Sequence, residues 1–272
     1  MNMIYLAFIF GLVFGSFLNV IIYRLKNDLP VSGRSFCPEC KAKLKWYDLV
    51  PLLSFIWLRG RCRYCHKKIS WQYPMVEILS GLIGTLVFSK NLDNFQFPIS
   101  NFQSLNIFYQ IFIFSALLVI AIYDARWKII PNKIIYSAIT AVFIFNVFKL
   151  LNFETFKFLN IEIFIRQLLT AIIAFLFFFL IYYFSKGKAM GLGDAKLAFL
   201  IGLFLGPWAL TAFISAFTIG AAFGIILIAL GKICPDYRKW GMKSQIAFGP
   251  FLVLGAFIAF FFSNFIIKIF QP

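Results

Sequence analysis

Long apolar stretches recur along most of the 272 residues of this chain. A helix needs about 20 apolar residues to cross a bilayer, because the hydrocarbon core is ~30 Å thick and each residue adds ~1.5 Å. Hydrophobic residues make up 62% of the chain and charged residues 13%, whereas a soluble domain has roughly a quarter charged. The sequence therefore excludes a water-soluble enzyme or a disordered tail and predicts an all-α polytopic membrane protein.

About eight transmembrane helices are expected. The second and sixth spans are short, so each could be tilted, broken or sheltered by its neighbours. The stretch 195–231 could also form one re-entrant element, although Gly206 and Pro207 favour a turn within it. The expected spans are 3–22, 74–89, 107–123, 132–150, 163–184, 195–206, 208–231 and 246–269.

The distribution of basic residues predicts the orientation. The net charge of +16 reflects 26 Lys and Arg residues against 10 Asp and Glu. With the N-terminus outside, 21 of the 26 fall in inner segments, namely 24–73, 124–133, 185–196 and 232–245. This asymmetry follows the positive-inside rule, so we expect both termini outside and residues 24–73 in the cytoplasm. Topology then accounts for the charge without a nucleic-acid partner.

Residues 24–73 also interleave basic and aromatic side chains, a mixture with three interpretations. Such a surface can bind RNA or single-stranded DNA, or it can dock a peptide substrate. Because the segment adjoins two membrane spans, we favour contact with anionic lipid of the inner leaflet, with the aromatic rings at headgroup depth.

Four of the five cysteines form two C-x2-C pairs separated by 21 residues, and they are Cys37, Cys40, Cys62 and Cys65. Two such pairs can supply four thiolates to a tetrahedral Zn²⁺ ion. A closed four-cysteine site leaves no open coordination position, so the zinc is expected to be structural; four free thiols or a redox pair are the alternative. A reducing cytoplasm argues against disulfides. His66 is expected to be an exposed loop residue, and Cys234 a plain loop thiol.

Two aspartates lie at the edges of apolar spans. Asp124 follows the run 107–123, and Asp194 closes the sequence Gly191-Leu-Gly-Asp. The charge-derived topology places both at cytoplasmic helix ends, and an ionisable residue at a membrane span is a functional hypothesis. Two neighbouring carboxyls share one proton, so that the ionised member takes a proton from water while the protonated member hydrogen-bonds the scissile carbonyl. Alternatively, the aspartates cap helices or pair with Arg126 and Lys196.

Several other residues carry local expectations. The glycines before Asp194 are expected to allow a backbone conformation that other residues resist. Glu77, at the start of the second span, should cap its helix or bind a cationic group. Asn19 should face other helices, and two Gly-x-x-x-Gly pairs should be close-packing faces; these pairs are Gly11 with Gly15 and Gly220 with Gly224.

The motifs together resemble the type IV prepilin peptidases, which are bifunctional leader peptidase/N-methyltransferases among the Gly-x-Gly-Asp intramembrane aspartyl proteases. The resemblance covers nearly the whole chain, with the motifs in family order. One departure is Asn132, where the family often has Asp. The matching motifs are Phe14–Arg24, Cys37–Cys40, Trp46–Asp48, Pro51–Ser54, Leu58–Cys62, Cys65, Tyr73–Glu77, Asp124 with Ile130-Pro131, Gly191–Leu197 and Phe248–Phe251.

The resemblance implies a function and a location. The protein would lie in the bacterial inner membrane and cleave the basic leader of prepilins or pseudopilins after a Gly at the cytoplasmic face, with Asp124 and Asp194 as catalytic residues. It would then N-methylate the new N-terminus from S-adenosylmethionine, through residues that the sequence does not assign. Because the enzyme surface is basic, local acids or anionic lipid are expected to offset repulsion of the leader, and these acids are Glu39, Asp48 and Glu77.

The expected organisation has three parts. Residues 1–23 form the first transmembrane helix, 24–73 the cytoplasmic four-cysteine zinc-binding segment, and 74–272 the multi-helix aspartyl peptidase domain. The alternatives are a membrane transporter that uses the two aspartates as ion sites and a non-enzymatic assembly scaffold. Transport normally calls for ionisable groups near the bilayer midplane rather than at its edge.

Overall fold

The structure is a computed structural model that describes residues 2–92, 101–151, 158–233 and 246–262. Over these residues the chain is helical, with two isolated β-bridges and no strand, which confirms the expected all-α architecture. The chain divides within a single helix into two compact units, Met1–Val119 and Ile120–Pro272. The second expected span packs against the first and so belongs to the first unit; the expected three-part organisation stays a prediction.

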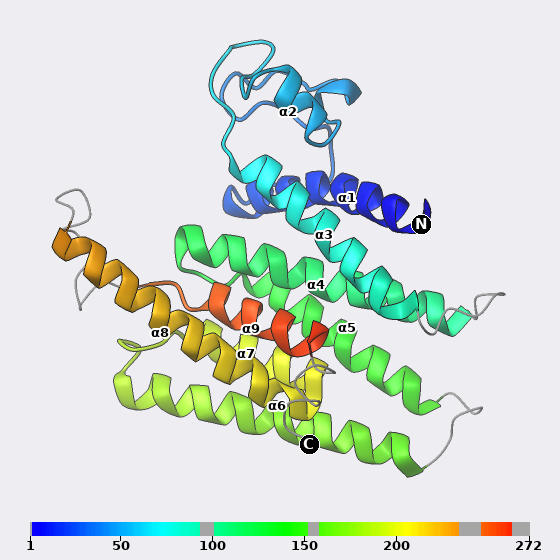
Figure 1. The fold of residues 1–272 in the computed structure, drawn as a ribbon, viewed down its shortest axis with the longest axis vertical. Helices are drawn as coiled ribbons and strands as arrows, with labels where there is room; N and C mark the ends of the chain where they lie inside the picture. Colours follow the sequence, from blue (N-terminus) through cyan, green and yellow to red (C-terminus); the bar gives the residue numbers. More distant parts are fainter. Residues whose placement is uncertain (1, 93–100, 152–157, 234–245, 263–272) are drawn as a thin grey trace. The chain divides into compact units, whose positions relative to one another are not determined.

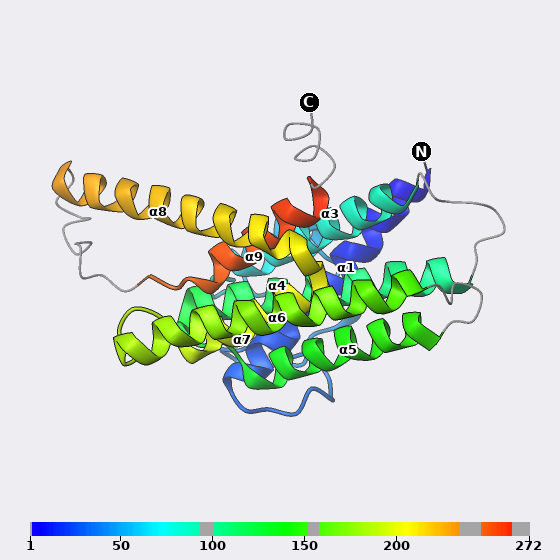
Figure 2. The same ribbon diagram turned by 90° about the horizontal axis from the view of Figure 1, so that it is seen from below.

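A helix occupies each of the eight expected spans (Figures 1 and 2), although 263–269 of the last span lie outside the described residues. The helices are α1 (Asn2–Lys26), α3 (Gln72–Leu92), α4 (Asn101–Trp127), α5 (Asn132–Leu151), α6 (Phe158–Ser185), α7 (Leu192–Leu205), α8 (Ala209–Ile233) and α9 (Gly249–Phe261). Five stretches of the described chain are long and apolar enough to cross a membrane, one of them running through α7 and α8. The expected turn between these two is a 3-10 helix, η3 (Gly206–Trp208).

In the first unit, α1 and α3 lie antiparallel and in close contact (Figure 1). A Cβ atom at Gly11 would stand 2.6 Å from the carbonyl oxygen of Ser80, and one at Gly15 would stand 2.7 Å from Cα of Glu77. Both positions therefore require glycine, as the Gly-x-x-x-Gly pattern predicted. The buried Asn19 side chain adds a hydrogen bond across the pair, donating to the carbonyl oxygen of Tyr73 at 3.0 Å.

In the second unit, α7 is the central helix. Most of its residues are buried, and it packs against α5, α6 and α9, while α8 packs against α9 (Figure 2). Gly202 lets α7 approach α6, since a Cβ atom there would stand 2.7 Å from Cα of Ala171. The second predicted glycine face is wrong, because a Cβ atom at Gly220 would make only ordinary contacts and one at Gly224 would meet nothing within 4 Å.

The outward faces of the helices are apolar. On α1, Phe10 is 71% exposed, and comparable side chains cover α6 and α8. Exposed apolar surface on this scale is unfavourable in water and is the normal surface of a helix in lipid. The protein is an integral membrane protein.

Candidate active site and four-cysteine centre

Asp124 lies in the last turn of α4. The helix ends because Lys128 adopts a left-handed conformation, with φ of 54°, and its amide donates back to the carbonyl oxygen of Asp124 at 2.7 Å. Asp124 is only 5% exposed, and its Oδ2 accepts a hydrogen bond from the Gly249 amide at 2.9 Å. Gly249 begins α9, whose first-turn amides lack helical partners, so the carboxylate satisfies one of them.

Asp194 lies in the first turn of α7 and is 9% exposed. Its Oδ2 accepts a hydrogen bond from the Gly191 amide at 3.1 Å. Asp194 therefore caps its own helix, as the alternative interpretation expected, but that bond uses only one of its two oxygens. Lys196 is not its partner, because the Lys196 ammonium donates to Oδ1 of Asn132 at 2.9 Å and lies over the Tyr136 ring.

The glycines before Asp194 act differently from the prediction. Gly191 has an ordinary extended backbone, with φ of −83°. Gly193 does not have a positive φ either. A Cβ atom at Gly193 would instead stand 3.0 Å from Cβ of Ile130. The missing side chain thus allows the start of α7 to lie against the turn between α4 and α5.

These contacts bring the two aspartates together within the second unit. The packing of Gly193 on Ile130 and the Lys196–Asn132 hydrogen bond join the segment after Asp124 to the first turn of α7. The two carboxylates are close enough to interact electrostatically. Both acids are buried, and each is bonded to a backbone amide through one oxygen. Two such carboxyl groups within electrostatic range of each other can activate a water molecule and polarise a carbonyl.

Sequence reasoning did not identify Gly249 as part of this site. The motif Phe248–Phe251 predicts a role in the last helix but none for its glycine. A Cβ atom at Gly249 would stand 2.6 Å from Oδ2 of Asp124, so the position both donates the hydrogen bond and leaves room for the carboxylate. A glycine directly before the proline of a helix start was the only available signal.

The four predicted cysteines also converge, in the first unit. They lie on two knuckles of the same design, each closed by a pair of hydrogen bonds and an isolated β-bridge. In the first, the Cys37 amide donates to the Ala42 carbonyl at 3.0 Å; in the second, the Cys62 amide donates to that of Lys67 at 2.9 Å. The bridges are Phe36–Lys43 and Arg61–Lys68.

The four Sγ atoms all lie within 4.8 Å of one another, and those of Cys37 and Cys65 are 4.0 Å apart. A tetrahedral zinc site with Zn–S bonds of ~2.3 Å has sulfur–sulfur edges of about 3.8 Å, so the cluster fits a metal after a small contraction. Burial raises the pKa of Cys37, but nearby amides and thiols outweigh it and bring the pKa to about 7. The Lys67 amide lowers the pKa of Cys65, yet burial and the other thiols bring it to about 11. His66 is exposed, as expected.

Two acids of the four-cysteine segment bond to the second knuckle, and of these Asp48 is buried whereas Glu39 remains half exposed. The Asp48 side chain, 3% exposed, accepts from Nε of Arg63 at 2.7 Å and from the hydroxyl of Tyr64 at 3.1 Å. Burial raises the pKa of Asp48, but the bonds from Arg63, the Lys45 amide and Tyr64 hold it below its usual value. Glu39 pairs with a lysine of the second knuckle at 2.5 Å.

Glu77 also has a partner within the four-cysteine segment. The residue is 7% exposed, and its carboxylate accepts a hydrogen bond from the Leu52 amide at 2.9 Å. Leu52 has a φ of 59°, which is strained for a residue with a side chain. Glu77 thus holds the four-cysteine segment to α3. Glu39, Asp48 and Glu77 each have a partner within the protein; that these acids or anionic lipid offset repulsion of a basic leader stays a prediction.

Residues 9–91 match the bacterial peptidase A24 N-terminal domain, and residues 111–230 match the type IV leader peptidase family. The chain is 32% identical over 208 residues to the prepilin leader peptidase/N-methyltransferase of Vibrio cholerae, covering 73% of this chain and 76% of the relative. The chain belongs to the type IV leader peptidase family.

Two further relatives in this family carry the same name. That of Bacillus subtilis is 28% identical over 98% of this chain and 97% of its own length. That of Dickeya chrysanthemi is 29% identical over 90% of this chain and 87% of its own length. No solved structure matches the chain. The first matched domain contains the four cysteines and the second contains both aspartates, so the resemblance inferred from the motifs is confirmed.

Proposed function

We propose that the protein is a prepilin leader peptidase and N-methyltransferase in which Asp124 and Asp194 carry out the hydrolysis. The observation that carries this proposal is the convergence of two buried carboxylates from helix ends 70 residues apart, within electrostatic range of each other. Membership of the type IV leader peptidase family supports the peptidase activity. The relatives' names support methylation of the new N-terminus.

The proposed reaction is general acid–base hydrolysis. The ionised carboxylate takes a proton from a water molecule, the protonated one donates a hydrogen bond to the scissile carbonyl, and water attacks without a covalent enzyme intermediate. The backbone bonds from Gly249 and Gly191 fix one oxygen of each carboxylate, which reduces the reorganisation required at the transition state.

The substrate and the location follow from the proposed topology. A prepilin or pseudopilin that spans the bacterial inner membrane presents its leader junction at the cytoplasmic face, and cleavage after Gly would occur where the helix ends bearing Asp124 and Asp194 lie. Both termini are then outside. We attribute the basic charge to this cytoplasmic side and propose no nucleic-acid partner. The positions of both aspartates in terminal helical turns disfavour the transporter alternative, which calls for groups near the midplane.

The decisive experiment is prepilin cleavage by the purified full-length protein and by Asp124→Asn and Asp194→Asn separately. Asparagine is nearly isosteric and keeps an oxygen acceptor, so each variant should fold while processing is abolished. Asp28→Asn, at an exposed aspartate, is the matched control and should cleave normally. Full cleavage by either Asp124→Asn or Asp194→Asn refutes the shared-proton mechanism. Normal pilus assembly in cells that carry these variants, with cleavage abolished, would support the scaffold alternative.

We further propose that the four cysteines hold a structural Zn²⁺ ion and that S-adenosylmethionine is the methyl donor. The thiol donor set and its spacing support the zinc. Metal analysis should find zinc in the parent protein and a large loss in Cys37→Ser; a parent protein that contains no metal contradicts the proposal. Transfer of a labelled methyl group from S-adenosylmethionine to a cleaved pilin tests the donor. If no labelled methyl group is transferred under any condition, the proposal that S-adenosylmethionine is the donor is refuted.

A further inference from the structure

A groove of about 630 Å³ lies in the first unit beside the short helix α2 (Leu53–Trp57), where the four-cysteine segment joins α3. Ile56, Ile69 and Ile78 form part of its apolar lining. Three basic side chains, Arg59, Arg61 and Lys68, line its other part. The lining therefore combines an apolar wall with a concentrated positive charge, which suits a ligand that is itself apolar at one end and anionic at the other.

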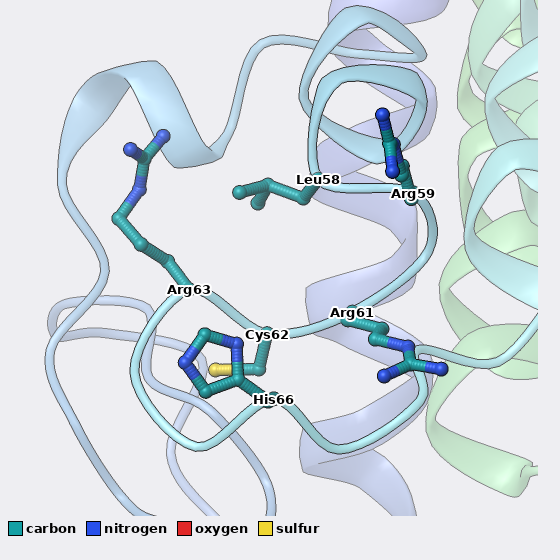
Figure 3. Close-up of a pocket in the computed structure, with 6 residues that line it drawn as sticks. All are labelled: Leu58, Arg59, Arg61, Cys62, Arg63 and His66. Atoms are coloured by element: carbon teal, nitrogen blue, oxygen red, sulfur yellow. The ribbon is translucent and has the colours of Figure 1, made fainter.

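The basic end of the groove has no internal counter-ion. In the part of the chain that the structure describes, no acidic side chain pairs with Arg59, Arg61 or Lys68. The nearby acids Asp48 and Glu39 are already bonded to other basic residues. Figure 3, a close-up of an adjoining pocket lined also by Leu58, Cys62 and His66, shows Arg59 and Arg61 on the side of the second knuckle away from Arg63. The charge is thus available to a ligand from outside the chain.

The apolar wall continues along the membrane helix. Ile78 belongs to both the groove and α3, and Leu82 and Leu86 follow it at helical spacing on the same face. These three side chains are 41%, 46% and 45% exposed, so they form an outward apolar stripe. Trp71, also in the groove and 74% exposed, lies just before α3 begins, where tryptophan is typically found at the membrane–water interface.

We propose that this groove is a binding site for a single anionic phospholipid. The phosphate lies among Arg59, Arg61 and Lys68, and an acyl chain follows the stripe that begins at Ile78. Since α1 and α3 are antiparallel, both ends of the four-cysteine segment reach the same membrane surface, and the groove opens at headgroup level. A zwitterionic lipid fits less well, because its ammonium group would face the three cations. The inference rests on the proposed placement of residues 24–73 at the membrane surface and not on the peptidase activity.

The test is native mass spectrometry of the full-length protein in detergent, titrated with phosphatidylglycerol or with phosphatidylcholine of the same acyl composition. The groove variant is Arg59→Gln/Arg61→Gln/Lys68→Gln. A matched control removes three charges from the first knuckle and its approach, Arg34→Gln/Lys41→Gln/Lys43→Gln. Each basic residue near an anionic headgroup contributes about fivefold in affinity, so the groove variant should bind phosphatidylglycerol at least tenfold more weakly. The control should bind as the parent does, and phosphatidylcholine should bind weakly to all three.

Several results would overturn the inference. Equal losses in the two triple variants would mean that overall charge, not this groove, attracts the lipid. Full competition by glycerol phosphate would identify a simple anion site, and a protein dimer lost only in the groove variant would assign the groove to a second copy of the chain. Should the triple variant fail to fold, Lys68→Gln alone should still lose about fivefold. Prepilin cleavage is measured separately, so failure of the lipid site and of the proposed activity are distinguishable.

Discussion

Replacing Gly249 by alanine should remove most of the peptidase activity while leaving the protein folded. The added Cβ would stand 2.6 Å from Oδ2 of Asp124, whereas ordinary contact begins at 3.4 Å, so the carboxylate must retreat by about 0.8 Å. A displacement of roughly 1 Å at a reacting group costs on the order of 100-fold in rate, or about 2.7 kcal/mol in transition-state stabilisation.

The stability cost should be small by comparison. The atom that must yield is the end of a side chain and not a backbone atom, and weakening the Gly249–Asp124 hydrogen bond costs about 0.5–1.5 kcal/mol. Alanine in place of glycine at a helical position stabilises the folded protein by up to about 1 kcal/mol, because its helix propensity is higher. The variant should therefore unfold within a few degrees of the parent protein, and its defect should lie in kcat.

The assay is steady-state cleavage of a prepilin by reconstituted protein, with thermal unfolding measured on the same samples. Gly224→Ala is the matched control, because a Cβ atom there meets nothing within 4 Å, and it should retain parental kcat. A folded Gly249→Ala variant with kcat within about twofold of the parent would show that the position of the Asp124 carboxylate does not limit the reaction. Equal losses in both alanine variants would point to a general effect of changing glycines.

Three further predictions concern stability. Gly15→Ala should destabilise the first unit by about 1–3 kcal/mol, because its Cβ would stand 2.7 Å from a backbone atom of Glu77; thermal unfolding like that of Gly224→Ala would contradict this. Glu77→Leu should cost about 1–3 kcal/mol by leaving the Leu52 amide unpaired, and zinc retention should fall, whereas Glu77→Gln should retain most of both. Asp48→Asn should be destabilising at neutral pH in denaturation followed by tryptophan fluorescence. The pKa of Asp48 is lowered in the folded state. The carboxylate therefore contributes fully to the free energy of unfolding above the unfolded pKa of about 3.9, and this contribution is lost as pH falls through the folded pKa. If the variant and the parent protein still differ as much in stability below that pH range, the linkage is ruled out.

The pattern of apolar, acidic and cysteine residues is enough to predict the class of the protein and most candidate site residues. Apolar stretches of membrane length leave few alternatives to helices, because unpaired backbone groups are too costly in lipid. Asp124 and Asp194 stood out because acids are scarce at the ends of such helices, and the cysteines because their spacing matches a metal site. These are local patterns, which can be recognised in a few neighbouring residues.

The contacts that each residue makes follow from the packing of the helices. The glycines of the first helix permit close packing, whereas those of Gly220-x-x-x-Gly224 show the same spacing without a close neighbour. The Asp48 side chain is buried against Arg63 and Tyr64 of the second knuckle rather than solvated. Gly249 meets Asp124 across 125 residues. A pattern along the chain fixes which side chains are available, but which backbone amide or glycine lies opposite depends on how the helices pack.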